Sequence, residues 1–345
     1  MTKEILIKDI TIGGGNKIAV QSMTNTKTAD VESTVAQIND LANAGCDIVR
    51  FTVNDDAAAD AVSKIVASTK VPLVADIHFD YKLAIKAIES GIHKIRINPG
   101  NIGGILNVKA VVAAAKAHKI PIRIGVNSGS IEKELLDKLG NSSEALFQSA
   151  VKNVNILESF GFDDIVISAK ASSVRRTVEV YRKLSVLQYP LHLGVTEAGY
   201  GEAALLKSSV AIGSLLLDGI GDTIRVSMTG EPTQEIYAAQ KILRAIGLDN
   251  NFVEIISCPT CGRTAFDLTS IVEELSRKTS DMKKHLKIAV MGCVVNGPGE
   301  AAECDFGIAG GKDSSALFVG GKVIGTVKND EIVSTLLRLA EEYDG

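Results

Sequence analysis

Between Ile18 and Met228, short runs rich in β-branched residues alternate with longer segments whose apolar residues recur at helical spacing. This alternation predicts a parallel sheet, and eight strand–helix units predict a closed (β/α)8 barrel, the TIM-barrel fold. An open doubly wound sheet is the alternative, although no G-x-G-x-x-G motif follows the first run. The eight runs begin at Ile18, Ile48, Pro72, Lys94, Pro121, Ile165, Pro190 and Thr223.

The pattern changes after the segment 247–251. Further runs are typical of strands, namely FVEIIS, KIAVMG, DFGIAGG, ALFVGG and KVIGTV, and helical spacing appears at 267–279 and 330–342. These elements predict a second, smaller α/β domain of ordinary size. We therefore expect a barrel domain at 1–249 and a second domain at 250–345.

One connection in the predicted barrel is longer than the others. The segment 127–146, NSGSIEKELLDKLGNSSEAL, inserts extra residues after the fifth strand. Connections at the carboxyl ends of barrel strands surround the active site, so we expect this insertion to act as a lid.

Composition limits the class of protein. Apolar residues make up 46% of the chain and charged residues 23%, which is typical of a globular protein with a large core. The net charge of −4 gives no general attraction to nucleic acid or to an anionic membrane surface. The first residues lack a secretory signal, and the most apolar stretch, 210–221, is shorter than a membrane span. We expect a cytoplasmic protein that binds neither nucleic acid nor membrane.

Polar side chains gather where the predicted strands end. In a parallel barrel these carboxyl ends meet at one mouth, where catalytic groups lie. The cations outnumber the two acids, so the mouth requires an anionic ligand, and forked guanidinium donors suit the oxygens of a diphosphate. The ring consists of Arg50, Asp76, His78, Arg96, Asn98, Arg123, Asn127, Lys170, His192, Thr196, Glu197, Arg225 and Ser227.

Four members of this ring have individual interpretations. Asp76 and His78 alternate on one strand and share a face, which is the lumen because polar groups facing the helices would lack partners. Glu197 is a candidate general acid or base, since few groups except the ligand would neutralise it. His192 precedes an apolar Leu-Gly-Val run and is either a satisfied core histidine or a ligand contact.

Five cysteines without a secretory signal indicate metal binding or redox chemistry rather than a disulfide framework. Cys258 and Cys261 form a C-x-x-C pair between a strand and a helix, and Cys293 lies in a glycine-rich turn. A thioredoxin-like pair leaves Cys293 unexplained, and a zinc ribbon needs a second C-x-x-C. A three-thiolate iron–sulfur site fits the count better, because bare backbone can approach a bulky cluster.

The spacing leaves the fourth ligand of such a cluster open: Cys304, Glu300 and solvent each fit. The remaining cysteine, Cys46, lies in the turn between a helix and a strand, where we expect a small buried apolar group. Cys304, at the start of a strand, is open to the same interpretation.

Eight motifs give the chain a specific resemblance: SCPTCGR, MGCVVNGPGEA, FGIAGG, RINPGNIG, IRIGVNSGS, ISAKAS, LGVTEAG and IRVSMTGEP. From Ile18 to the C-terminus it resembles the 4-hydroxy-3-methylbut-2-en-1-yl diphosphate synthase family of the non-mevalonate isoprenoid pathway. The resemblance implies a TIM barrel followed by a domain similar to those of sulfite and nitrite reductases, which holds a [4Fe–4S] cluster. It also implies reductive ring opening and dehydroxylation of 2-C-methyl-D-erythritol 2,4-cyclodiphosphate, with two electrons from a flavodoxin or a ferredoxin.

The resemblance also assigns roles to residues. It implies Cys258, Cys261 and Cys293 as thiolate ligands and Glu300 as the fourth ligand. A carboxylate oxygen binds cluster iron less firmly than a thiolate and can leave to open one position for substrate oxygen. Glu197 is our choice for proton transfer to the departing hydroxyl. The implied substrate-binding set is Arg50, Asp76, His78, Arg96, Asn98, Arg123, Asn127, Lys170, Arg225 and Ser227.

The last predicted barrel helix, 231–246, leads away from the mouth by about 24 Å at 1.5 Å per residue. The second domain therefore begins at the far end of its own barrel, and the linker is too short to return it to the mouth. We expect a head-to-tail homodimer in which each cluster domain caps the barrel of the other subunit, as the resemblance also implies.

Two other functions remain as alternatives. One is a zinc-stabilised sugar-phosphate lyase on the same barrel, which a brown absorption lost on oxidation would exclude. The other is a non-catalytic iron–sulfur carrier, which tight binding of the cyclic diphosphate would exclude.

Overall fold

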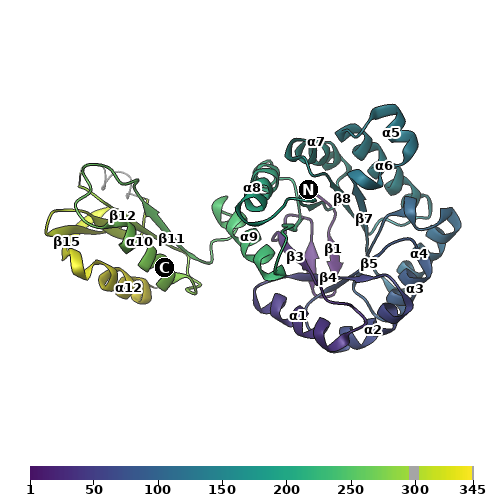
Figure 1. The fold of residues 1–345 in the computed structure, drawn as a ribbon, viewed down its shortest axis with the longest axis horizontal. Helices are drawn as coiled ribbons and strands as arrows, with labels where there is room; N and C mark the ends of the chain where they lie inside the picture. The colour runs from purple at the N-terminus through teal and green to yellow at the C-terminus, as the bar shows by residue number, and fades with distance from the viewer. Residues whose placement is uncertain (295–302, 344–345) are drawn as a thin grey trace. The chain divides into compact units, whose positions relative to one another are not determined.

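The computed structural model describes residues 1–294 and 303–343, and its contacts divide the chain into two compact units (Figure 1). The first unit is Met1–Ile246 and the second is Gly247–Gly345. Each unit has a hydrophobic core of its own. The division lies just before the segment 247–251, a few residues ahead of the boundary expected after residue 249.

The sheet of the first unit is a closed parallel barrel. Its strand order is β8-β7-β6-β5-β4-β3-β10-β9, and a bridge between Ile167 and Leu191 joins the two end strands. The predicted (β/α)8 barrel is confirmed, because an open sheet would leave β8 and β9 apart. The strands are β3 (Ala19–Met23), β4 (Ile48–Val53), β5 (Leu73–Ile77), β6 (Lys94–Ile97), β7 (Ile122–Asn127), β8 (Ile165–Lys170), β9 (His192–Leu193) and β10 (Thr223–Ile224).

A ring of helices surrounds the barrel, as Figure 1 shows. Asp30, Asp55 and Asp80 each accept a hydrogen bond from a backbone N–H of the first turn, which explains where three of the helices begin. Apolar residues at helical spacing, such as Ile38 and Leu41, are buried against the strands. The helices that follow the strands are α1 (Val31–Asn43), α2 (Asp56–Ala67), α3 (Tyr81–Glu89), α4 (Gly104–His118), α6 (Ser143–Ser159), α7 (Val174–Leu184), α8 (Gly201–Leu217) and α9 (Pro232–Ala245).

A hairpin that the sequence analysis did not anticipate closes the amino-terminal end of the barrel. Strand β1 (Ile5–Ile7) pairs antiparallel with β2 (Ile10–Ile12). Its buried isoleucines pack against residues near the starts of the barrel strands, including Ala19, Ile48 and Val166. The polar–apolar alternation of the first ten residues is therefore that of a strand with one buried face. Apolar side chains fill this end of the lumen.

The insertion after the fifth barrel strand contains a short helix, α5 (Lys133–Leu139), which contacts α6. Leu135, Leu136 and Leu139 are partly buried and pack against the main core of the first unit. The insertion is thus attached to the barrel by an apolar face.

The helix formed by the most apolar stretch of the sequence is α8, and it lies in the barrel wall with Ala211, Ile212 and Leu215 fully buried. Across residues 1–294 and 303–343, no helix has both the length and the apolarity of a membrane span.

The second unit is a mixed sheet with two helices. Strands β11, β12 and β13 are parallel neighbours, and β14 and β15 continue the sheet antiparallel. The helices α10 (Leu268–Thr279) and α12 (Ile332–Glu342) pack with the strands in one core, where Leu275, Ile288 and Leu336 are fully buried. The predicted α/β character of this part is confirmed. The strands are β11 (Val253–Ser257), β12 (Leu286–Met291), β13 (Phe306–Ala309), β14 (Ser314–Val319) and β15 (Lys322–Lys328).

Candidate active site

A small charged cavity, called the inner cavity below, lies at the carboxyl ends of the barrel strands. Its volume is about 160 Å3, and all its described lining residues belong to the ring predicted from the sequence. They come from β4 to β8 and from the loops after β5, β9 and β10. The lining residues are Arg50, Asp76, His78, Arg96, Arg123, Asn127, Lys170, Thr196, Arg225 and Ser227.

The strand register places basic side chains on one face of the sheet. Asp76 is the register partner of Arg96, and Arg96 is the register partner of Arg123. Register partners point to the same side of a sheet, and the alternating residues Ile95 and Ile97 belong to the core under the helices. The alternation of isoleucine with lysine or arginine in β6 and β7 therefore sends the basic side chains into the lumen.

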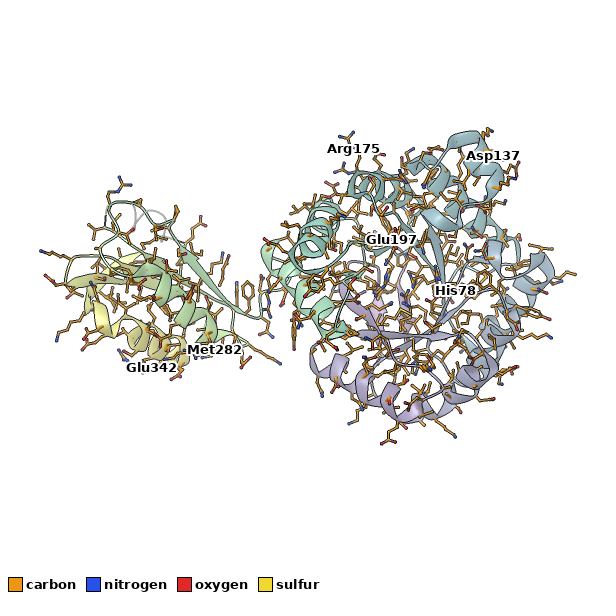
Figure 2. All side chains as sticks on the ribbon, in the orientation of Figure 1. His78, Asp137, Arg175, Glu197, Met282 and Glu342 are labelled. Atoms are coloured by element: carbon orange, nitrogen blue, oxygen red, sulfur yellow. The ribbon has the colours of Figure 1, made fainter. Side chains whose placement is uncertain are left out.

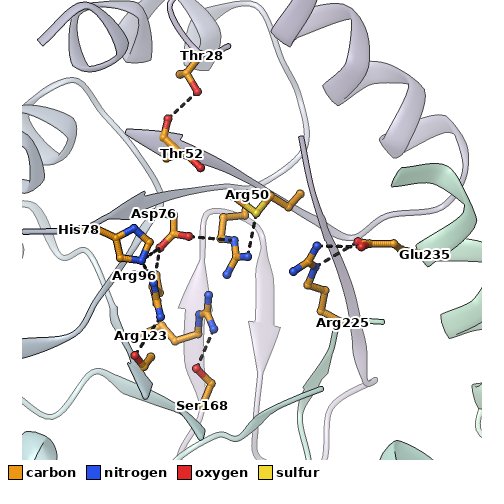
Figure 3. A network of polar contacts seen from close by, with 12 residues as sticks. Thr28, Arg50, Thr52, Asp76, His78, Arg96, Arg123, Ser168, Arg225 and Glu235 are labelled. Carbon is orange, nitrogen blue, oxygen red and sulfur yellow. Dashed lines mark hydrogen bonds and ion pairs between the residues drawn. The ribbon is translucent and has the colours of Figure 1, made fainter. Parts of the chain in front are cut away.

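Asp76 is the central carboxylate of the inner cavity (Figure 3). Arg96 Nη1 donates to Asp76 Oδ1 at 3.0 Å, and Arg50 Nε lies 3.7 Å from Asp76 Oδ2. His78 contacts Arg96, and its Nε2 lies 3.8 Å from Asp76 Oδ1. Burial would raise the pKa of Asp76, but the charges of Arg50 and Arg96 outweigh burial and hold that pKa below its usual range. Burial lowers the pKa of His78, which favours the neutral imidazole. Asp76 therefore lies between two arginines and this ring.

Arg123 and Lys170 are buried cations that form no ion pair with a carboxylate within the described residues. Arg123 Nη1 donates to Ser168 Oγ at 2.8 Å, but its Nε and Nη2 have no hydrogen-bond partner in the same part of the chain. Burial lowers the pKa of both cations well below the usual range, and the neighbouring arginines lower it further. Repulsion between two unit charges 4 Å apart is roughly 4 kcal/mol near a protein surface, whereas a hydrogen bond such as that from Arg123 to Ser168 contributes about 1 kcal/mol net. The hydrogen bond therefore does not offset the repulsion among the basic groups. These cations therefore favour an anionic ligand.

One acidic residue of the site lies on a helix, and the sequence analysis missed it. Glu235 of α9 is 4% exposed and pairs with Arg225 through hydrogen bonds of 2.9 and 3.2 Å (Figure 3). The sequence carries a signal for it, because Glu235 stands between Pro232 and Ile236 on the buried face of an amphipathic helix. A carboxylate on that face needs a partner, and here the partner is a strand-end arginine.

Two glycines in the lumen make room for the cations. A Cβ on Gly125 would lie 2.0 Å from Arg96 Nε, and a Cβ on Gly194 would lie 2.8 Å from Lys170 Nζ. Arg96 Nη2 instead donates to the carbonyl of Gly125 at 3.0 Å. The missing side chains thus allow Arg96 and Lys170 to extend across the lumen. Neither glycine belongs to the site predicted from the sequence.

A larger cavity of about 520 Å3, called the outer cavity below, shares His78, Arg96, Asn127 and Thr196 with the inner cavity. It contains the two predicted site residues that the inner cavity lacks, Asn98 and Glu197. Figure 2 shows His78 and Glu197 inside the ring of barrel helices. Residues 128–130 and 141 of the insertion also line the outer cavity. The two cavities together bring every predicted ring residue except His192 to one mouth.

Two residues of the outer cavity have unusual backbone conformations. Glu197 has a φ of 55° and Phe79 a φ of 67°, both in the left-handed region. Strain of this kind concentrates at functional sites. Phe79 is also 73% exposed, so an apolar ring stands at the rim of an otherwise polar cavity. Such a ring can contact the carbon part of a ligand whose charged part lies deeper.

A further set of buried polar groups in the barrel consists of Gln21, Lys94 and His192, none of which lines the inner or outer cavity. Lys94 Nζ, both ring nitrogens of His192 and both amide atoms of Gln21 lack a hydrogen-bond partner among the described residues. Burial lowers the pKa of Lys94 and of His192 well below the usual range, and Arg123 adds to this effect. Of the two interpretations of His192, a satisfied core histidine or a ligand contact, its full burial favours the core, although its ring has no hydrogen-bond partner among the described residues. Lys94 was not anticipated.

The cysteine loops of the second unit follow two neighbouring parallel strands. Cys258 follows β11, Cys293 follows β12, and the Gly292 N–H donates to Cys258 Sγ at 3.2 Å. The Ala265 N–H also donates to the Gly292 carbonyl at 2.9 Å. The C-x-x-C loop and the glycine-rich turn therefore lie side by side.

Glycines let the segments around the cysteine loops pack closely. A Cβ on Gly292 would lie 2.9 Å from Thr264, and a Cβ on Gly310 would lie 2.5 Å from Phe266, so bare backbone lies close to these loops. Thiolates are the ligands that iron–sulfur clusters use, and backbone N–H groups bind their sulfur atoms. No three His, Cys, Asp or Glu side chains in residues 1–294 and 303–343 are arranged to hold a single metal ion.

Three further residues, Glu300, Cys46 and Cys304, were considered in the sequence as ligands or buried groups. Glu300, the implied fourth ligand, lies outside the described residues. Cys46 is 5% exposed, and burial raises the pKa of its thiol to about 12. Cys304 is 3% exposed and packs with Ala289 and Phe318. Cys46 is thus a buried apolar group, as expected, and the burial of Cys304 favours the same interpretation for it.

Known proteins match the chain over nearly its whole length. The GcpE TIM-barrel domain matches residues 2–240, and the GcpE protein C-terminal domain matches residues 254–342. A 4-hydroxy-3-methylbut-2-en-1-yl diphosphate synthase (flavodoxin) from Caldanaerobacter subterraneus subsp. tengcongensis is 56% identical over 99% of this chain and 97% of its own length. The protein of the same name from Clostridium perfringens is 54% identical over 99% of this chain and 98% of its own length.

A solved structure of Yersinia pestis dihydropteroate synthase is similar in fold. It has a TM-score of 0.51, covers 72% of this chain and 100% of its own, and is 13% identical in sequence. At that identity the likeness supports the barrel fold alone. The two domain models and the closely similar relatives confirm the resemblance that the eight motifs indicated. The chain therefore belongs to the GcpE family of 4-hydroxy-3-methylbut-2-en-1-yl diphosphate synthases.

Proposed function

We propose that this chain catalyses the reductive ring opening and dehydroxylation of 2-C-methyl-D-erythritol 2,4-cyclodiphosphate to 4-hydroxy-3-methylbut-2-enyl diphosphate. Two electrons enter, a ring carbon–oxygen bond and a carbon–hydroxyl bond break, and a carbon–carbon double bond forms. The hydroxyl leaves as water after it gains a proton. The identity to relatives of that name along nearly the full chain supports this activity.

The observation that carries the proposal is the excess of positive charge at the inner cavity. Asp76 and Glu235 are the carboxylates that pair with its basic residues. The five basic residues outnumber the two carboxylates, and this excess suits a cyclic diphosphate and not a neutral sugar. The five basic residues are Arg50, Arg96, Arg123, Lys170 and Arg225.

The basic residues divide into two groups, which suggests how they act. Arg50, Arg96 and Arg225 are held by carboxylates, so their remaining donors have fixed directions. Arg123 and Lys170 have no such partner among the described residues, and they supply the charge that a ligand would neutralise. We propose that all five bind the diphosphate oxygens. Asp76, His78, Asn98, Asn127 and Ser227 would then line the carbon skeleton and its hydroxyls.

Glu197 is our candidate for the proton transfer to the departing hydroxyl. It is exposed, it lies in the outer cavity, and its strained backbone fixes the direction in which the side chain leaves the main chain. A carboxyl group in that position can hold a proton at its Oε atoms while the diphosphate occupies the inner cavity.

Cys258, Cys261 and Cys293 are our candidates for holding a [4Fe–4S] cluster, with Glu300 as the fourth ligand. When bound, such a cluster supplies electrons one at a time. The chain contributes the thiolates and an N–H donor to sulfur from Gly292.

The electron donor that we propose is flavodoxin, since the relatives carry that word in their names. A ferredoxin was the alternative in the sequence analysis. Reduced cysteine ligands and a reduced flavoprotein are both stable in a reducing compartment, so we propose a cytoplasmic location.

We further propose that the chain works as a head-to-tail homodimer. Helix α9 follows the carboxyl end of β10, and its 14 residues lead about 21 Å toward the other end of the barrel before the second unit begins at Gly247. Co-expression of an Arg123→Ala chain with a Cys293→Ser chain tests this idea. Each chain alone should be inactive, and the mixed dimer should regain one working site. A mixed dimer without activity would contradict the arrangement.

Anaerobic purification tests the proposed function itself. We expect brown protein with about four irons and four sulfides per chain. Incubation with the cyclic diphosphate and reduced flavodoxin should then yield the linear diphosphate. Colourless protein that contains zinc, or iron-loaded protein that leaves the cyclic diphosphate unchanged, would contradict the proposal.

A further inference from the structure

The Glu235 carboxylate joins three elements beside the inner cavity. Its Oε1 accepts hydrogen bonds from Arg225 Nη2 at 2.9 Å and from the Met228 N–H at 3.2 Å. Its Oε2 accepts from Arg225 Nε at 3.2 Å and from Ser22 Oγ at 2.8 Å. These contacts connect helix α9, the loop after β10 and strand β3.

Both oxygens of Glu235 are therefore occupied by donors from the protein. The residue is 4% exposed and does not line the inner cavity. Any effect of Glu235 on a ligand must act through the groups that it holds. Those groups include Arg225 and, through the Met228 N–H, the loop that carries Ser227, and both residues line the cavity.

The pairing also fixes which donors of Arg225 face the ligand. Its Nε and one Nη2 hydrogen point to Glu235, which leaves the Nη1/Nη2 edge of the guanidinium for the cavity. Two parallel hydrogen bonds hold the plane of the guanidinium, whereas an unpaired arginine samples many rotamers. The Arg225 side chain is 18% exposed, so this edge remains accessible from the cavity.

We propose that Glu235 is a positioning residue for anion binding. It fixes the Arg225 guanidinium and the Ser227 loop in the orientation that a diphosphate group requires. The inference rests on the proposed function, because it takes the ligand of the inner cavity to be a diphosphate ester.

Charge and orientation make opposite predictions for Glu235→Gln. Removal of one negative charge makes the cavity more positive, and this effect alone would tighten the binding of an anion. The amide, however, keeps a single acceptor and turns an NH2 group toward the guanidinium or the loop, so the bidentate pair is lost. If positioning is the larger effect, the anion binds more weakly despite the added positive charge.

Titration of the holoenzyme with inorganic diphosphate tests the inference. We expect Glu235→Gln to raise the dissociation constant about tenfold and to lower the melting temperature, because Arg225 loses its buried partner. Glu231→Gln is the matched control, because Glu231 is exposed at the start of the same helix, makes no side-chain cap and loses the same charge. The control should bind diphosphate as the wild type does. Unchanged or tighter binding by Glu235→Gln would overturn the inference.

A double-mutant cycle separates positioning from a general loss of structure. Arg225→Met should weaken diphosphate binding, and Glu235→Gln should cause a smaller loss in that background than in the wild type, because only its contact with the Ser227 loop remains to be lost. Additive losses would show that Glu235 acts elsewhere and would overturn the inference. If Glu235→Gln does not fold, Glu235→Asp keeps the charge, and it should raise KM for the cyclic diphosphate more than it lowers kcat. A wild type that binds no diphosphate would refute the proposed function, whereas a binding wild type with an unaffected variant would refute this inference alone.

Discussion

The barrel mouth and the cysteine loops differ in how completely the protein builds them. At the mouth, Asp76 and Glu235 hold arginines in buried ion pairs, and glycines are placed where a Cβ would collide with a cation. In the second unit, Cys258 is partly buried and Cys261 is exposed, and the Gly292 N–H donates a hydrogen bond to Cys258 Sγ. Within the described residues the mouth is preorganised, and we propose that a bound cluster would order the cysteine loops.

This difference follows from what each site does in the proposed reaction. A substrate arrives and leaves in every cycle, so any ordering of its binding groups would reduce affinity each time. A bound cluster stays, and its own bonds can hold the loops in place. The two sites should therefore respond differently to substitution, and the following experiments are arranged from the largest expected effect to the smallest.

Cys258→Ser should have the largest effect. A serine hydroxyl does not replace a thiolate at iron, so we expect iron content to fall to background and turnover to fall below detection. Thermal denaturation of the barrel should be unchanged, because the cysteine belongs to the second unit. Cys304→Ala is the control and should keep both iron and activity. Full iron content in Cys258→Ser would contradict our assignment of the ligands.

Arg123→Met should weaken substrate binding roughly 100-fold, about 2–3 kcal/mol, because it removes a buried charged donor. The same change should stabilise the free protein, since the unpaired guanidinium is replaced by an apolar side chain. A gain of 1 kcal/mol corresponds to roughly 2–4 °C in melting temperature for a domain of this size. Calorimetric titration and thermal denaturation measure the two effects. A variant that binds normally or melts lower would contradict the role of Arg123.

Gly125→Ala tests the space in the lumen. Its Cβ would lie 2.0 Å from Arg96 Nε, so the guanidinium must move, and we expect about tenfold weaker substrate binding. Gly213→Ala is the matched control in the same unit, where the nearest atom to the new Cβ is 4.0 Å away. That control should bind normally and be slightly more stable, because alanine favours a helix. Equal binding by both variants would show that Arg96 does not need the space.

Asp76→Asn should have a smaller effect, which is a change in how protein stability depends on pH in the acidic range. The pKa of Asp76 in the folded protein lies below its ordinary value of 3.8, because Arg50 and Arg96 outweigh burial. Its contribution to stability is present above that ordinary value and is lost as pH falls toward the folded pKa. The wild-type barrel should lose stability between about pH 5 and pH 2 more steeply than the variant. Urea denaturation across this range measures the difference, and parallel curves would contradict the prediction.

Much of the fold and of the barrel site could be predicted from the sequence, for physical reasons. Parallel strands align their carboxyl ends, so reading the end of each β-branched run was enough to find Arg50, Arg96 and Arg123. The period of two within β6 and β7 also indicated which side chains enter the lumen. Even β9 and β10, each of two residues, were found, because their flanking sequence carried the same pattern.

The parts that were missed depend on contacts between distant segments. Glu235 lies on a helix and reaches Arg225 only when α9 packs beside β3. Reading the residues at the strand ends therefore could not identify it. Gly125 and Gly194 matter because of side chains on other strands that cross the lumen. The hairpin of β1 and β2 is stable only with the barrel floor beneath it.

The most direct test of the central claim is a titration of the iron-loaded protein with the cyclic diphosphate, for wild type and Arg123→Met prepared with equal iron content. We predict one binding site per chain in the wild type and roughly 100-fold weaker binding in the variant, because the mouth alone selects the anion. Equal affinities would contradict the claim that the barrel mouth, and not the cysteine loops, binds the anion.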